Sequence, residues 1–217
     1  MIEPDDRRRV RWPGTIRQRI GDRLRARWMT MILHAALTPH PPEAFGAFGR
    51  GSVIVPPARI SLPEFVFVGD GVVIHEGVWL SIERREDAPP PRLEIGDGVR
   101  LGRFMQISCV GEIVIEADVI ASDRVQIGDS YHDYHDVTVP ATRQPMVPSR
   151  PVRIGRGALL GAGVVVLPGT TIGAGAYIAD GAVARGVVPP GSVVAGNPGT
   201  VVADLLSSRE GAGPALR

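Results

Sequence analysis

Aliphatic residues recur at every sixth position along most of the chain. From Ile154 the sequence reads IGRGAL LGAGVV VLPGTT IGAGAY IADGAV, and each group of six begins with an aliphatic residue. Earlier stretches keep the same spacing, which gives fifteen leading positions in all: Val68, Ile74, Leu80, Ile95, Leu101, Ile107, Ile115, Ala121, Ile127, Ile154, Leu160, Val166, Ile172, Ile178 and Ala184. A fixed period of this kind indicates a repeat architecture.

The period of six fits neither an α-helix nor a plain strand, and it predicts a short strand followed by a bend. Glycine, which reaches bend conformations that other residues resist, often stands one or three positions after the leading residue, as at Gly155 and Gly157. Three sixes then form one coil of a flat-sided spiral, whose stacked coils hydrogen-bond to one another. Fifteen sixes predict five coils. The alternative, a β-sandwich with glycine-rich turns, does not keep a fixed six-residue period.

Two segments interrupt the repeat and predict loops. Residues 83–92 read ERREDAPPPR, and residues 129–151 read DSYHDYHDVTVPATRQPMVPSRP. A long loop in a repeat domain is usually either a functional excursion or disordered. We expect the coils to occupy residues 49–200 with the inserted loop at 129–151, an N-terminal basic extension at 1–48, and a short C-terminal helix followed by a tail at 201–217.

The N-terminal extension is rich in arginine. Residues 1–30 hold nine arginines against four acidic residues, and Ile16, Ile20, Leu24 and Trp28 form one stripe of an expected helix over residues 16–28. Such a basic amphipathic helix either packs on the coils or a neighbouring subunit, or lies on an anionic membrane surface. Because no apolar run is long enough for a membrane span, we expect a cytoplasmic protein, either free or at the inner membrane surface.

Composition excludes several kinds of chemistry. The 24 basic residues, all arginine, balance 23 acidic ones, and a net charge of +1 argues against a nucleic-acid partner. A chain without lysine has no Schiff-base or P-loop lysine. Cys109 is the only cysteine, so no intramolecular disulfide forms.

The long loop holds the candidate chemistry. His132 and His135 lie there beside Asp129, Asp133 and Asp136. A loop histidine near carboxylates can act as a general base near neutral pH. A solvated polar loop and a divalent-metal site are the alternatives, and we predict no metal because no strong ligand spacing is present.

The repeat, the histidine loop and the ending VPPGSVVAGNPGTVV resemble the hexapeptide-repeat acyltransferases, most closely their sugar and polysaccharide O-acetyltransferase branch. The resemblance implies an all-β protein, a left-handed parallel β-helix, here with a short N-terminal helical extension. It also implies a homotrimer with active sites between adjacent prisms, acetyl-CoA as co-substrate, and a sugar or glycan hydroxyl as acceptor.

The same resemblance implies roles for individual residues. His132 matches the family's general base, and His135 is the second choice. In the loop, Asp129, Ser130 and Tyr131 would bind the acceptor. The Ala162 backbone N–H would stabilise the oxyanion, and Arg185 would contact a coenzyme A phosphate. The residues expected at the cofactor are Gly161, Ala162, Asp180, Arg185, Asn197 and Pro198.

Three alternatives remain at this point. The acceptor could be the amine of an amino sugar, which makes the protein an N-acetyltransferase. A metal protein like the γ-class carbonic anhydrases would take its ligands from His75, His132 and His135. The third alternative is a non-catalytic scaffold, against which the histidine loop and the GNP ending argue.

Overall fold

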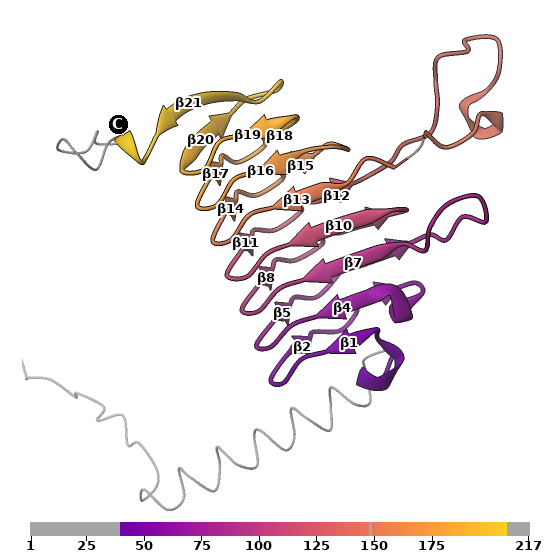
Figure 1. The fold of residues 1–217 in the computed structure, drawn as a ribbon, viewed down its shortest axis with the longest axis horizontal. Helices are drawn as coiled ribbons and strands as arrows, with labels where there is room; N and C mark the ends of the chain where they lie inside the picture. The colour runs from indigo at the N-terminus through magenta and orange to yellow at the C-terminus, as the bar shows by residue number, and fades with distance from the viewer. Residues whose placement is uncertain (1–39, 148, 208–217) are drawn as a thin grey trace, which may run out of the picture. The chain divides into compact units, whose positions relative to one another are not determined.

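The computed structural model describes residues 40–147 and 149–207, which form three β-sheets and no α-helix. Successive short strands visit the three sheets in turn as far as β20, and each strand from β1 to β17 pairs in parallel with the strand three places later (Figure 1). This is the topology of a parallel β-helix, consistent with the left-handed coil that the resemblance implies. The expected helix over residues 16–28 lies outside the described residues, and no described helix is long and apolar enough to cross a membrane.

The strands of each sheet follow one another in spatial order. The first sheet contains β1 (Ala47–Phe48), β4 (Val66–Val68), β7 (Arg92–Ile95), β10 (Glu112–Ile115), β13 (Val152–Ile154), β16 (Thr171–Ile172) and β19 (Val187–Val188). The second contains β2 (Val53–Ile54), β5 (Val73–Ile74), β8 (Arg100–Leu101), β11 (Ile120–Ala121), β14 (Leu159–Leu160), β17 (Tyr177–Ile178), β20 (Ser192–Ala195) and β21 (Thr200–Asp204). The third contains β3 (Arg59–Ile60), β6 (Trp79–Ile82), β9 (Gln106–Cys109), β12 (Gln126–Gly128), β15 (Val165–Val166) and β18 (Val183–Ala184). Three short 3₁₀ turns complete the described elements: η1 (Pro42–Ala44), η2 (Pro63–Phe65) and η3 (Ala141–Arg143).

The core of the coils confirms the six-residue period predicted from the sequence. All fifteen leading residues are buried, with at most 3% of each exposed. The structure adds one coil before them, formed by β1, β2 and β3, and two further sides after them, β19 and β20. The six-residue pattern ends at Ala184 because the next inward residue, Val188, follows after four positions instead of six.

Glycine serves the repeat for two different reasons. Three positions after the leading residue the backbone turns left-handed, as at Gly157 with a φ of +66°. Phe104 and Arg124 adopt the same conformation without being glycine, which the sequence did not indicate. One position after the leading residue the neighbouring coil is too close for a side chain: a Cβ on Gly155 would lie 2.6 Å from the backbone nitrogen of Ala174.

The C-terminal helix expected after residue 200 is wrong. Residues 200–204 form β21, which pairs antiparallel with β20, for example Val194 opposite Val201. β20 ends a sheet and would otherwise present a row of unpaired backbone groups. Val201 and Val202 are β-branched and favour an extended strand, so pairing at this open edge outweighs the helix.

Candidate active site

The long loop leaves the coils at one edge, which we call the loop edge. There each third-sheet strand leads to the next first-sheet strand, and the loop connects β12 to β13. Its first and last residues pair as an antiparallel ribbon: Val147 donates its N–H to the Tyr131 carbonyl at 2.9 Å, and Asp133 donates its N–H to the Pro145 carbonyl at 2.9 Å. The loop stands out from the stacked coils and carries η3 far from them (Figure 1).

Asp129 anchors the base of this ribbon. Its side chain is fully buried, and its carboxylate accepts the backbone N–H groups of Val110 and Gly111 at 2.9 and 2.7 Å. Burial raises the pKa of the Asp129 carboxyl, against the lowering effect of these N–H donors. The structure therefore gives Asp129 a structural role in place of the predicted acceptor contact. The Ser130 hydroxyl also belongs to the ribbon, since it donates to the Val147 carbonyl at 2.7 Å.

The two loop histidines have different surroundings. His132 is exposed and lies opposite Met146 in the ribbon. His135 is exposed too, but its Nδ1 lies 2.5 Å from an oxygen of Asp133, and its ring stacks on Tyr134 with centroids 4.8 Å apart. Hydrogen bonds from the backbone and ring of His135 lower the pKa of Asp133. Among the described residues, a carboxylate thus pairs with His135 and not with His132.

Five of the predicted cofactor residues gather along a second edge, which we call the 2–3 edge because second-sheet strands lead there into the third sheet. Gly161 and Ala162 follow β14, Asp180 follows β17 on the next coil, and the Asn197–Pro198 turn follows β20. These five positions therefore lie along one edge of the coils.

One contact on the 2–3 edge bears on the role expected for Ala162. The Ala162 N–H, expected as a free oxyanion donor, donates instead to the Asp180 carboxylate at 2.8 Å. The same capping occurs on other coils, since Arg50 and Arg103 donate their N–H groups to Asp70 and Asp123. A carboxylate at a bend can accept a hydrogen bond from a backbone N–H that has no backbone acceptor in the coil.

Arg185 lies apart from the other predicted cofactor residues. It follows β18 on the loop edge and is exposed. Within residues 40–147 and 149–207 it has no ion pair or hydrogen bond from its side chain. The loop edge therefore carries both the histidine loop and an arginine free to contact an anion.

A residue that the sequence analysis missed links the two loops. The guanidinium of Arg85, in the proline-rich loop between β6 and β7, donates from Nη1 to the carbonyl of Met146 at 3.2 Å. A signal for this contact was present, because residues 83–92 and 129–151 both follow a third-sheet strand and so leave from the same edge.

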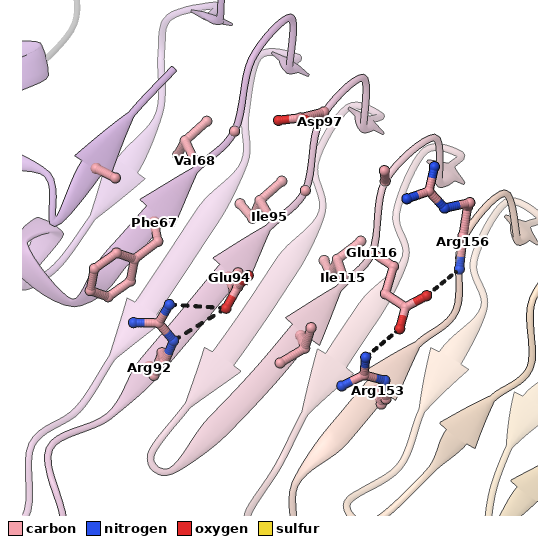
Figure 2. A pocket seen from close by; sticks show the side chains of 15 residues that line it. Phe67, Val68, Arg92, Glu94, Ile95, Asp97, Ile115, Glu116, Arg153 and Arg156 are labelled. Atoms are coloured by element: carbon pink, nitrogen blue, oxygen red, sulfur yellow. Dashed lines mark hydrogen bonds and ion pairs between the residues drawn. The ribbon is translucent and has the colours of Figure 1, made fainter.

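A shallow groove of about 620 Å³ runs along the outer face of the first sheet (Figure 2). Arg92 pairs with Glu94 at 3.0 Å, and the carboxylate of Glu116 accepts hydrogen bonds from the Arg153 side chain and the Arg156 backbone. The arginines that line the groove thus have acidic neighbours, so the groove is polar but has no strong positive electrostatic potential. We assign no reacting group to it.

No group of three potential metal ligands occurs in the part of the chain that the structure describes. His75, needed for the carbonic-anhydrase alternative, follows β5 on the 2–3 edge, 3.8 Å from the Glu76 carboxylate. His132 and His135 stand on the loop edge, so one chain does not bring the three imidazoles together.

Comparison with known proteins agrees with this architecture. Residues 151–186 match the family described as bacterial transferase hexapeptide (six repeats). The chain is 33% identical to a Mycobacterium tuberculosis protein named "Probable acetyltransferase Rv3034c", over 92% of this chain and 70% of that protein. It is 30% identical, over 49% of its length and 57% of the relative, to Escherichia coli WbbJ, which is named for O-acetyl transfer in lipopolysaccharide biosynthesis.

Solved structures show the same fold. A mutant of AntD, an N-acyltransferase from Bacillus cereus crystallised with dTDP and coenzyme A, superimposes with a TM-score of 0.64 at 17% identity, over 75% of this chain and 85% of that one. The coils, with their glycine bends, define a parallel β-helix of the hexapeptide-repeat type. The chain belongs to the hexapeptide-repeat acetyltransferase family.

Proposed function

We propose that the protein transfers an acetyl group from acetyl-CoA to a hydroxyl of a sugar or glycan, with His132 as the general base. The observation that carries the proposal is the exposed imidazole of His132 on a hydrogen-bonded ribbon in a chain of this family. The relative named for lipopolysaccharide O-acetyl transfer supports a glycan acceptor.

The reaction needs one proton to move twice. His132 accepts the proton of the acceptor hydroxyl, and the oxygen attacks the thioester carbonyl carbon. The carbon–sulfur bond then breaks, and the imidazolium returns the proton to the departing thiolate. Positioned general-base catalysis of this kind contributes about 10²–10⁴-fold to the rate.

The 2–3 edge is the proposed binding strip for acetyl-CoA. Gly161 has no side chain and the Asn197–Pro198 turn flanks the strip, so an extended chain can lie close to the backbone. Arg185, on the loop edge, is the proposed partner of a coenzyme phosphate, which a guanidinium can bind with two parallel hydrogen bonds. Because Asp180 holds the Ala162 N–H, that donor serves the oxyanion only after the carboxylate moves aside.

The two edges lie at opposite ends of the third-sheet strands, which supports a site shared between subunits. His132 of one chain would face the 2–3 edge of the next in a homotrimer. The outward side of the second sheet offers a surface for this contact, since Ile120 and Leu159 are 46% and 39% exposed and lie side by side in register. Val73, Tyr177 and Val193 continue the apolar column, which only Arg100 interrupts.

A thiol-release assay with acetyl-CoA tests the proposal against a panel of sugars, amino sugars and oligosaccharides. We expect release of coenzyme A that depends on an acceptor hydroxyl, and a product whose acetyl group is removed by mild base as an ester. An alkali-stable amide would instead identify an N-acetyltransferase. Absence of release with every acceptor, or stoichiometric zinc in the purified protein, would contradict the proposal.

A further inference from the structure

The ribbon that carries His132 is supported from outside by a second loop. In an antiparallel pair, residues opposite each other alternate between those that exchange backbone hydrogen bonds and those whose N–H and C=O groups point outward. The ribbon bonds of Tyr131 with Val147 and of Asp133 with Pro145 flank the His132–Met146 pair. The carbonyl of Met146 therefore points away from His132, toward the neighbouring loop.

Arg85 meets this outward carbonyl. Its guanidinium donates from Nε and Nη2 to the two carboxylate oxygens of Asp87 at 2.9 and 2.8 Å, and from Nη1 to the Met146 carbonyl at 3.2 Å. The two bonds to Asp87 fix the plane of the guanidinium, because its donors form a rigid fork. Asp87 thus aims Nη1 at the ribbon.

The support has a physical reason. A two-stranded ribbon in water is only marginally stable. An outward carbonyl without a hydrogen-bond partner adds nothing to its stability. The side chain of Arg85 is 24% exposed, against 69% for Asp87, so the guanidinium lies between the two loops while the carboxylate faces solvent. Arg85 is the only residue of residues 83–92 whose side chain has a hydrogen bond to the described part of the histidine loop.

We infer that Arg85 is a positioning residue that holds His132 in place through the backbone of Met146. This inference rests on the proposed function, since it names the residue that orients the proposed base. It gives the proline-rich loop a role that the repeat does not explain. The two loops act as one unit on the loop edge.

The variant Arg85→Ala tests the inference, with Arg84→Ala as the matched control. Arg84 is the neighbouring exposed arginine, and its guanidinium stands 6.0 Å from the Phe65 ring instead of contacting the ribbon. We expect Arg85→Ala to lower kcat about tenfold, because a small displacement of a catalytic group costs up to about 10²-fold. KM for acetyl-CoA and the melting temperature stay unchanged. Arg85→Lys, which keeps a positively charged donor group but loses the planar fork, should recover part of the activity.

Two further measurements separate positioning from other effects. In the His132→Ala background, Arg85→Ala should cost nothing more, because two residues that act through one group are not additive. Backbone amide exchange in peptides spanning residues 130–147 should become about tenfold faster in Arg85→Ala and remain unchanged in Arg84→Ala.

The outcomes distinguish this inference from the proposed function. Unchanged exchange and unchanged kcat in Arg85→Ala, with an active parent protein, would overturn the inference alone. A full additional loss in the His132→Ala background would also overturn it. An inactive parent protein whose exchange still responds to Arg85→Ala would overturn the proposed transfer and leave the link between the loops established.

Discussion

The backbone N–H of Ala162 donates to the carboxylate of Asp180 at 2.8 Å, one coil farther along the 2–3 edge. This bond joins a predicted oxyanion donor to the one acidic residue among the predicted cofactor positions. The carboxylate both occupies the donor and places negative charge where negative charge would develop.

Removing that carboxylate should increase turnover. We expect Asp180→Ala to raise kcat about tenfold, since one well-placed oxyanion donor is worth about 10²–10³-fold and only part of this is recovered. Thiol-release kinetics measure the change. Asp70→Ala is the control, because Asp70 caps the Arg50 N–H in the same way on another edge. A fall in kcat in the Asp180 variant alone would show that the carboxylate assists the reaction.

The choice between the two histidines has a direct kinetic test. His132→Ala should lower kcat by about 10²–10⁴-fold, the usual contribution of a general base. His135→Ala should have a smaller effect, and His40→Ala, whose ring contacts the Ile60 carbonyl on the first coil, should have none. The assignment fails when His135→Ala has the larger effect.

Stability should depend on pH through Asp129. Burial raises its pKa above the value of about 3.9 in unfolded chains, so the native state binds the proton more tightly. Its contribution to stability is therefore complete below pH about 3.9 and is lost as pH rises through the native pKa. Urea unfolding from pH 4 to 7 should show the parent protein losing stability relative to Asp129→Asn. A difference between the two proteins that is independent of pH would contradict this prediction.

The two glycine positions of the repeat should differ in their tolerance of a methyl group. Gly157→Ala places alanine at a φ of +66° in open space, which costs about 1 kcal/mol. Gly155→Ala forces a Cβ to within 2.6 Å of the next coil's backbone, and we expect a loss of about 3 kcal/mol. Denaturant unfolding of both variants gives the comparison, and equal losses would show that the coils separate easily.

The apolar column of the second sheet should hold the proposed homotrimer together. Ile120→Arg places a charge among exposed apolar side chains, and we expect sedimentation analysis to show monomers. Thr171→Arg, at an exposed outward position of the first sheet, is the control and should remain a trimer. A trimeric Ile120 variant would move the subunit contact to another face.

The sequence predicted the coils well because their physics is local and periodic. A leading aliphatic residue such as Leu160 and a bend glycine such as Gly163 are visible in any one repeat. The candidate site was harder to predict from the sequence than the coils. The Asp180 carboxylate accepts a hydrogen bond from a backbone group on another coil, and Arg85 donates to a residue sixty-one positions away in the sequence. Such contacts leave no repeating residue pattern, and the signal for the Arg85 contact lies only in both loops following a third-sheet strand. The C-terminal strand escaped prediction for the same reason, since its partner is an open edge.

β21 has a consequence for how the protein behaves in concentrated solution. A stack of parallel coils has no inherent limit, and its last strands could template those of another molecule into a growing fibre. On the second sheet β21 turns back against β20, and on the third sheet Val183 exchanges backbone hydrogen bonds with Gly196 and Gly199. The chain thus closes two of its three terminal rows by itself, which protects it from end-to-end polymerisation.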